Sequence, residues 1–313
     1  MKTLILGASG LAGTAVSKLM IEKRRECLKP SSYELNLLDV SSVREFFNTN
    51  EISSVYFLAA KVGGAPANSA RPLEFLLQNL QMEINVLETA LERRIPRLIF
   101  LSSSTIYPEF SSQPHKEDGI FSGKLSPSVQ PYALAKLVGM EILKIAVEKF
   151  GLSWVSVIPA NLYGPGDNFR IHDSHVVAAI IRKIWESKVS RSRQLEVLGD
   201  PNNGRDFLFS NDLAAALHFL EENYFGDTPV NIGPGKITSI GALVNLLTDL
   251  MSYSGEINWN GTQVSGTARK ALDNSKLVEL GFSSFTELRT GLSEVLRWLE
   301  NESKFNFRNI RWD

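Results

Sequence analysis

Residues 3–13 of the chain read Thr-Leu-Ile-Leu-Gly-Ala-Ser-Gly-Leu-Ala-Gly. The apolar residues 3–6 predict a buried strand, and Gly7, Gly10 and Gly13 follow it at a GxxGxxG spacing. Glycine at a strand-to-helix turn permits a tight backbone, a close approach to a pyrophosphate and close packing of the helix, whose free N–H groups face the anion. The stretch predicts a dinucleotide-binding loop that also includes Ser9 and Leu11. An ordinary glycine turn is the alternative.

Outward from this loop, short β-branched and aliphatic runs alternate with helical patterns. The runs are 3–7, 55–60, 97–103 and 154–159, and the helical patterns include 71–94 and 130–150. Such alternation is typical of a parallel sheet covered by helices on both faces. The sequence therefore predicts an α/β protein with a Rossmann-type doubly wound parallel sheet.

Two polar segments interrupt the alternation, at 162–175 and 199–206. Both are rich in Gly, Asn and Asp, so we expect them to form part of a site. After the second segment we expect a strand and then a helix capped near Ser210 or Asn211. The predicted domains are a dinucleotide-binding domain of residues 1–164 and 206–232, and a smaller mixed α/β substrate-binding lobe of residues 165–205 and 233–313.

The composition argues against several classes of partner and site. A net charge of −1 over 313 residues gives no electrostatic reason to expect nucleic acid or an anionic membrane as a partner. The single cysteine, Cys27, excludes an intrachain disulfide and fits a reducing compartment. Because the sequence shows no signal peptide and no apolar run of about 20 residues, we expect a cytoplasmic protein. The four histidines show no ligand spacing, so we expect no metal.

Tyr132 and Lys136 lie four residues apart in a helical pattern, so their side chains share one face. An ammonium beside a phenol favours the phenolate, so we expect Lys136 to lower the pKa of Tyr132 from its usual value of about 10. A surface pair on an exposed helix is the alternative. With Ser103 at a strand end and the glycine loop before it, the pair forms a complete set for reducing a carbonyl group.

Several further stretches carry a family resemblance. They are ELNLLD (34–39), AAKVGG (59–64), SSTIYP (103–108), YALAK (132–136), NLYGPGDNF (161–169), SHV (174–176) and RDF (205–207). On these motifs the chain resembles the extended short-chain dehydrogenase/reductases, and within them the GDP-L-fucose synthase family of GDP-4-keto-6-deoxy-mannose epimerase/reductases. The resemblance covers nearly the whole chain. It implies a Rossmann fold, a nicotinamide cofactor, a nucleoside-diphosphate 4-keto sugar as substrate, GDP-linked by resemblance, and a homodimer formed by helices 71–94 and 130–150.

The resemblance also implies roles for individual residues. Ser103, Tyr132 and Lys136 match the reductase triad, in which the tyrosine protonates the carbon 4 oxygen, the serine binds that oxygen and the lysine holds the cofactor ribose. The expected cofactor-binding residues outside the glycine loop are Lys29, Ser32, Asp39, Ala59, Ala60, Lys61 and Lys136. The expected substrate-binding residues are Asn161, His175, Lys183, Arg205 and Lys270, with Arg269 a further candidate. Asp39 could equally cap a helix, Asn161 could tie down a turn, and the cations could be solvated surface charges.

Thr105 departs from the family pattern. Family members that invert the carbons beside the ketone use a cysteine in the SSxIYP stretch and a histidine in the SHV stretch, and here these positions hold Thr105 and His175. A thiol titrates near neutral pH, whereas an aliphatic hydroxyl does not. We therefore expect a reductase of a 4-keto-6-deoxyhexose or heptose that does not epimerise it. His172 or Glu109 could supply the second proton instead, and epimerase activity would then persist.

Two other functions fit parts of the sequence. Sugar-nucleotide 4-epimerases also carry threonine at this position and cycle bound NAD, but the AAKVGG and DNF…SHV stretches argue against them. A non-catalytic nucleotide-sensing scaffold would be favoured by loss of Tyr132 or Lys136, and both are present.

NADPH is the expected cofactor, with NADH the alternative. No acidic residue precedes Glu34 after the second strand, which argues against recognition of a free ribose. Ser9 and Ser32 stand where the family carries arginines for the 2′-phosphate. We expect Lys29, with Ser31 and Ser32, to form a weaker phosphate site.

Overall fold

The computed structural model describes residues 2–171, 173–261, 268–303 and 312. Its larger lobe contains a sheet of six parallel strands in the order β2-β1-β3-β4-β5-β9. The strands are β1 (Lys2–Leu6), β2 (Cys27–Leu28), β3 (Ile52–Phe57), β4 (Arg97–Leu101), β5 (Ser153–Pro159) and β9 (Val230–Ile232). The predicted Rossmann-type doubly wound sheet is confirmed.

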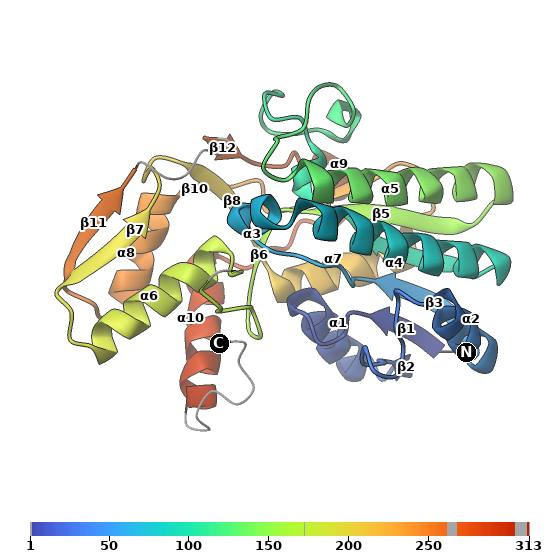
Figure 1. Cartoon of the computed structure of the whole chain (residues 1–313), viewed down its shortest axis with the longest axis horizontal. Coiled ribbons are helices and arrows are strands. Elements are labelled where there is room, and N and C mark those ends of the chain that lie inside the picture. The colour runs from blue at the N-terminus through green and yellow to red at the C-terminus, as the bar shows by residue number, and fades with distance from the viewer. Residues whose placement is uncertain (1, 172, 262–267, 304–311, 313) are drawn as a thin grey trace.

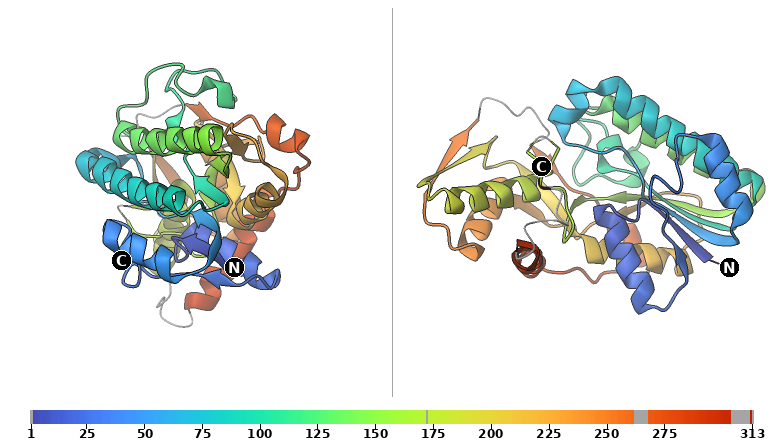
Figure 2. Two further views of the ribbon diagram at one scale, coloured as in Figure 1. Left: turned by 90° about the vertical axis from the view of Figure 1, so that its right-hand side faces the viewer. Right: turned by 60° about the horizontal axis from the view of Figure 1, so that its bottom comes forward.

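Helices cover both faces of this sheet (Figures 1 and 2). On one face α1 (Leu11–Glu22) packs against α7 (Ser210–Asn223). The other face carries α2 (Val40–Thr49), α4 (Pro72–Glu92) and α5 (Gln130–Phe150), with the short α3 (Ala65–Ala70) leading into α4. The two long predicted helices are thus α4 and α5. The predicted polar cap of α7 is wrong: Phe209 is the N-cap and makes no side-chain cap bond, and Ser210 is the first helical residue.

The chain reverses direction across the sheet at β1, which pairs with β2 on one side and β3 on the other. Doubly wound sheets bind ligands outside the carboxyl ends of the strands at such a point. There Gly7, which follows β1, has a φ of +84°, and a Cβ on it would lie 2.7 Å from the Ala59 nitrogen after β3. Only glycine satisfies both conditions, so this residue fixes the turn.

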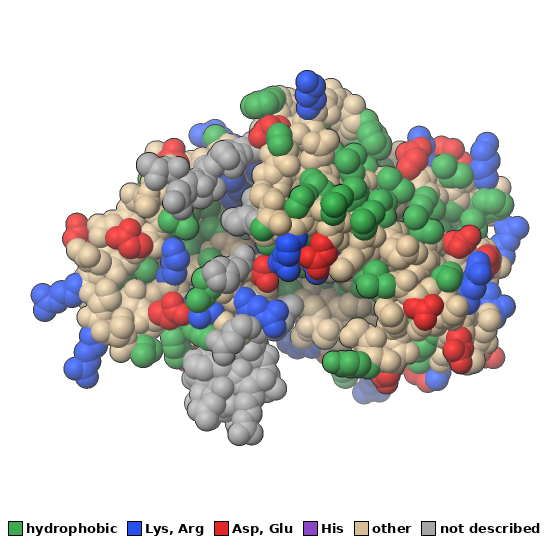
Figure 3. All heavy atoms as spheres, viewed as in Figure 1, with side chains coloured by type: hydrophobic (Ala, Val, Ile, Leu, Met, Phe, Trp, Pro, Cys, Tyr) green, Lys and Arg blue, Asp and Glu red, His purple; other side chains and the backbone are tan. Residues whose placement is uncertain are grey.

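The smaller lobe is mixed α/β, as predicted. Its main sheet pairs β8 (Gly204–Phe209) with β10 (Ile237–Ser239), β12 (Arg269–Lys270) and β6 (Asn161–Tyr163), and β7 (Gln194–Leu198) pairs with β11 (Glu256–Asn260). Its helices are α6 (Val176–Val189), α8 (Ile240–Leu250) and α10 (Leu288–Ser303), and α9 (Ser275–Glu279) follows β12. Figure 3 shows the surface hollowed between the two lobes.

Each lobe has its own hydrophobic core. The first core gathers the buried residues of the six-stranded sheet and its helices, and the second gathers those of α6, β7, α8 and α10. Leu272 and Leu277, which follow β12, are buried in the first core, so the chain returns to the larger lobe there. Where the chain divides between the two domains stays a prediction. No helix among the described residues is long and apolar enough to span a membrane.

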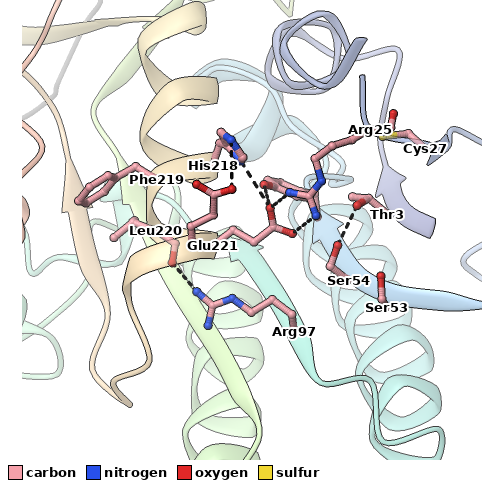
Figure 4. Close-up of polar contacts among 12 residues, drawn as sticks. Thr3, Arg25, Cys27, Ser53, Ser54, Arg97, His218, Phe219, Leu220 and Glu221 are labelled. Carbon is pink, nitrogen blue, oxygen red and sulfur yellow. Dashed lines mark hydrogen bonds and ion pairs between the residues drawn. The ribbon is translucent and has the colours of Figure 1, made fainter. Parts of the chain in front are cut away.

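A polar network joins α7 to the amino ends of the central strands (Figure 4). The buried Glu221 carboxylate accepts hydrogen bonds from both Arg25 terminal nitrogens and, at 2.8 Å, from the Tyr56 hydroxyl of β3. Arg97, the first residue of β4, donates to the Leu220 and Tyr224 carbonyls. Burial opposes ionisation of Glu221, but these bonds and the Arg25 charge outweigh it and lower the Glu221 pKa. The network therefore anchors α7 at the edge of the sheet opposite the glycine loop.

Candidate active site

The glycine loop leaves room for a phosphate against the backbone. A Cβ on Gly13 would lie 2.0 Å from the Gly7 carbonyl oxygen, so α1 packs on the turn at a distance that only glycine allows. Gly10 is the N-cap of α1 and provides no side-chain cap bond, which leaves the first N–H groups available to an anion. Leu11 begins the helix. These features fit the pyrophosphate of a dinucleotide.

A cavity of about 710 Å³ lies between α1 and the loop after β2. Its polar and charged lining includes Ser9, Ser17, Lys18, Lys29, Ser31 and Ser32, together with Glu22. The nearby Glu34 carboxylate accepts the Ser31 N–H and Oγ–H, both at 2.8 Å. These bonds lower the Glu34 pKa and engage the one acidic group that the sequence offered for a free ribose. The cavity, next to the glycine loop at Ser9, fits the adenosine end of the cofactor, with two lysines for a 2′-phosphate.

The residues of the predicted triad come from two neighbouring elements. Ser103 caps the short helix η1 (Ser104–Ile106), which directly follows β4, and Tyr132 and Lys136 lie one turn apart on α5. The Ser103 hydroxyl is near enough to the Tyr132 phenol to lower its pKa, and Lys136 Nζ lies 6.0 Å from the centre of the Tyr132 ring. Lys136 is 1% exposed. The structure thus brings the three residues together.

Thr105 belongs to η1, the short helix that follows β4. Its Oγ1 donates to Ser103 Oγ at 3.0 Å, and its backbone N–H donates to the same oxygen at 3.2 Å. A serine hydroxyl has two acceptor sites and one proton. Because Thr105 occupies both acceptor sites, the Ser103 proton is directed away from Thr105, toward Tyr132 or a substrate oxygen.

The expected effect of Lys136 on Tyr132 is wrong for this structure. Burial raises the pKa of the Tyr132 phenol, the negative charge of Glu83 raises it further, and the Ser103 hydrogen bond lowers it only in part. Lys136 does not reverse this because its ammonium lies 3.1 Å from the Glu83 carboxylate, which offsets its charge. The phenol therefore stays protonated through neutral pH, in the form that donates a proton.

Three predicted substrate residues meet on the smaller lobe. Lys270 of β12 lies beside Arg205 of β8 in register, and His175 is the N-cap of α6. Surrounding protein and the positive charge of Arg205 lower the pKa of Lys270 to about 7. The His175 side chain is open to solvent, and the protein around it together with Lys270 lowers its pKa. The three residues form a cluster of cations and an imidazole that suits a diphosphate.

Other predicted residues make structural contacts. Asn161 donates to the Asp206 carbonyl at 3.0 Å and ties β6 to β8, and Lys183 Nζ donates to the Glu196 carbonyl at 2.9 Å. Asp39 caps α2 by accepting the Ser41 N–H at 2.9 Å.

The remaining predicted residues are Lys61, in the loop after β3, and the two alternative proton donors, Glu109 and His172. Lys61 follows Ala59 and Ala60 and pairs with Glu74, and its backbone N–H and carbonyl hydrogen-bond the Asn79 side-chain amide. Glu109 accepts a hydrogen bond from Ser126. His172 lies outside the described residues, and among those described no three His, Cys, Asp or Glu side chains gather as a metal site.

Sequence reasoning missed Glu83 and Lys18. Glu83 lies on the buried face of α4, and helical spacing could have placed it there, because Phe75, Asn79, Glu83 and Val86 recur every three or four residues. Lys18 has no comparable signal, since its place at the cavity depends on how the loop after β2 returns to α1.

Comparison with known proteins identifies the family of this chain. Residues 3–233 match the model of the NAD dependent epimerase/dehydratase family. The chain belongs to this family. GDP-L-fucose synthase 1 of Arabidopsis thaliana is 37% identical over 298 residues, covering 95% of this chain and 92% of that protein. The predicted membership of the extended short-chain dehydrogenase/reductases is confirmed, and the protein is an oxidoreductase of that family.

Two solved structures of this fold are similar over nearly their whole length. A GDP-6-OMe-4-keto-L-xylo-heptose reductase from C. jejuni superposes with a TM-score of 0.90 at 25% identity, covering 96% of this chain and 98% of that one. A GDP-L-fucose synthetase from Naegleria fowleri bound to NADP superposes with a TM-score of 0.89 at 25% identity, covering 99% and 94%. Both lobes of the chain, and not the sheet alone, are therefore shared with these enzymes.

Proposed function

We propose that the protein reduces the carbon 4 ketone of a GDP-4-keto-6-deoxy sugar, a hexose or a heptose, without inverting the neighbouring carbons. Its relatives act on GDP-linked sugars and include a 4-keto sugar reductase. The observation that carries the proposal is the pair of bonds from Thr105 to Ser103, at 3.0 and 3.2 Å. The position that holds a thiol in epimerising family members here directs the hydroxyl that binds the ketone oxygen, so it serves reduction.

Each residue of the triad has a step in this reaction. The Ser103 hydroxyl donates a hydrogen bond to the carbon 4 oxygen, and the Tyr132 phenol gives that oxygen its proton. Because burial and Glu83 keep the phenol protonated, Tyr132 is ready as an acid at neutral pH. Lys136 Nζ, with three donors, has hydrogen bonds left for the cofactor ribose beyond its contact with Glu83.

NADPH is the cofactor, and it supplies the hydride. We propose that its 2′-phosphate lies in the cavity beside α1, between Lys29 and Lys18, with the hydroxyls of Ser31 and Ser32 near it. Two ammonium groups would there replace the arginines of the family pattern. The Glu22 carboxylate on the same cavity wall makes this a weaker site than a pair of arginines would make.

On the substrate side, we propose that Arg205 and Lys270 bind the diphosphate and that His175 binds the sugar. A second copy of the chain is the proposed partner, docked on α4 and α5. These helices expose Leu73, Leu77, Ile84, Leu134, Val138 and Ile145, and Figure 3 shows apolar side chains gathered over them. An apolar face of this kind is typical of an interface between subunits. A cytoplasmic location stays a prediction.

The first test is the oxidation of NADPH, followed by its absorbance at 340 nm, in the presence of GDP-4-keto-6-deoxy-mannose. We expect one NADPH consumed per keto sugar and a product that lacks the ketone. No oxidation with this sugar or its heptose counterpart would contradict the proposal and favour a scaffold.

A further inference from the structure

Glu83 is a buried carboxylate at the centre of the larger lobe that the reaction as described does not use. It lies on α4 and is 1% exposed. Its Oε1 lies 3.1 Å from Lys136 Nζ of α5. Apart from this ion pair, neither carboxylate oxygen has a hydrogen-bond partner among the described residues. Burying a carboxylate that has no hydrogen bonds is unfavourable, so the ion pair with Lys136 is the interaction that favours a charged Glu83 here.

The residues around the ion pair of Glu83 and Lys136 leave space for the carboxylate. Gly139 of α5 lies one turn beyond Lys136, and a Cβ there would lie 2.9 Å from Glu83 Oε2 and 2.6 Å from Phe100 Cζ. The missing side chain therefore makes room for the carboxylate between the two helices. The Lys136 ammonium also lies 4.5 Å from the centre of the Phe100 ring, a cation–π distance. The ammonium thus contacts both a carboxylate and a ring face.

The negative charge of Glu83 also acts on the Tyr132 phenol, the proton donor of the proposed reaction. The charged groups that act on Glu83 and Tyr132 come from the two helices packed together here: Lys136 and Tyr132 from α5, and Glu83 from α4. Ser103, just after β4, lowers the phenol pKa in part. Burial raises the pKa of Glu83, and Lys136 offsets that only in part, so the carboxylate is weakly compensated. Its negative charge is felt at the phenol.

We propose that Glu83 is a positioning residue of the reduction: it fixes the Lys136 ammonium and keeps the Tyr132 phenol in its protonated, proton-donating form. The proposal rests on the proposed function in that it takes Tyr132 as the acid. It assigns to α4, which supplies no member of the triad, the group that offsets the Lys136 charge beside Tyr132. Without Glu83, the Lys136 charge would be uncompensated and would lower the Tyr132 pKa, against the effect of burial.

The direct test follows Tyr132 in the protein without substrate or cofactor. Protein labelled with 3-fluorotyrosine, in which the ring fluorine brings phenol titration into the accessible pH range, is titrated by ¹⁹F NMR, and Tyr132→Phe assigns the resonance. In Glu83→Gln we expect Tyr132 to ionise at a pH about one unit lower than in the wild type, because one negative charge is gone. Equal titration in the two proteins would overturn the proposal.

Two further variants separate this effect from a general loss of packing. Thr89→Val removes another buried polar group of α4, whose Oγ1 donates to the Asn85 carbonyl of the same helix at 2.7 Å. We expect it to leave the Tyr132 titration unchanged. Glu83→Asp retains the charge and should titrate closer to the wild type, and it carries the test if Glu83→Gln does not fold. A shift in Thr89→Val as large as that in Glu83→Gln would contradict the proposal.

A kinetic measurement then links the shift to the reaction. In Glu83→Gln the alkaline limb of the kcat/KM profile for NADPH oxidation should move to lower pH, with Glu83→Asp between the two. If no 4-keto sugar is reduced, the proposed function fails while the NMR result still decides the role of Glu83. If the sugar is reduced and neither limb nor resonance moves, the proposal about Glu83 fails alone.

Discussion

Glu83 and Glu221 are both buried glutamates of the larger lobe, and they lie near opposite ends of β4. Glu221 accepts hydrogen bonds from Arg25 and Tyr56, and its pKa is lowered despite burial. Glu83 has one ion pair, to Lys136, and its pKa is raised. The same side chain is thus satisfied at the amino end of the sheet and left weakly compensated at the carboxyl end, where ligands bind.

The difference indicates that Glu221 stabilises the fold, whereas Glu83 acts on the chemistry of the site. A fully bonded carboxylate holds elements together and is kept ionised by its partners. A carboxylate with one partner transmits its charge to the next titratable group, here Tyr132. Each glutamate is paired with a tyrosine, Glu221 with Tyr56 and Glu83 with Tyr132, so matched substitutions can test the contrast.

The largest expected difference is between the two tyrosines. Tyr132→Phe removes the acid that protonates the ketone, and we expect kcat to fall by roughly 10²- to 10⁴-fold with NADPH binding retained. Tyr56→Phe removes a hydrogen bond to Glu221 and should lower the melting temperature with kcat within about twofold of the wild type, since Tyr56 touches no group of the site. Stopped-flow NADPH oxidation and thermal melts measure both. A catalytically normal Tyr132→Phe would break the contrast.

The second prediction compares the free energies of unfolding of Glu221→Gln and Glu83→Gln, and the pH dependence of the Glu221 contribution. Glu221→Gln leaves Arg25 without its counter-charge, and we expect a loss of about 3 kcal/mol at pH 7. We expect a smaller loss for Glu83→Gln, because the raised pKa of Glu83 shows that Lys136 does not fully offset the cost of burying its charge. The folded pKa of Glu221 is lowered, so its stabilisation is present above the unfolded pKa of about 4.3 and is lost as pH falls through the folded value.

Chemical denaturation of the wild type and Glu221→Gln from pH 7 to about pH 3, below the unfolded pKa, checks this sign. The stability gap between the two proteins should narrow as the pH falls. A gap that widens toward acid would show that the Glu221 carboxylate is not held ionised by its partners.

The smallest expected effect concerns the cavity beside α1. Replacing both Lys18 and Lys29 with Gln should weaken NADPH binding by about tenfold and leave NADH binding within about twofold, because only the 2′-phosphate loses its cations. Lys23→Gln, at the C-cap of α1 and outside the cavity lining, is the control. Nucleotide fluorescence titrations give both constants. Equal weakening for NADPH and NADH would place the phosphate elsewhere.

Much of the fold could be predicted because local patterns determine it. The strand runs, the two long helices and the GxxGxxG turn each depend on neighbouring residues, and the positive φ of Gly7 explains why glycine stands there. The N-cap of α7 was mispredicted because packing of β8 into the core, and not a polar cap, decides where that helix begins.

The sequence predicted which residues form the site, but not how they affect one another. Motif spacing brought Ser103, Tyr132 and Lys136 together, but the sign of the pKa change at Tyr132 depended on burial and then on Glu83, which comes from another helix. The role of Thr105 likewise depended on the turn of η1, which aims its hydroxyl at Ser103. Contacts across elements of this kind leave no periodic signal in a single sequence.

The most direct test of the central claim is the product made from GDP-4-keto-6-deoxy-mannose and NADPH in deuterated water, analysed by NMR. We expect reduction at carbon 4 with protium retained at carbons 3 and 5, because Thr105 cannot serve as the second proton-transfer group. Deuterium at those carbons in an inverted product would show that another group completes the pair with His175, and would contradict the assignment of this protein as a reductase that does not epimerise.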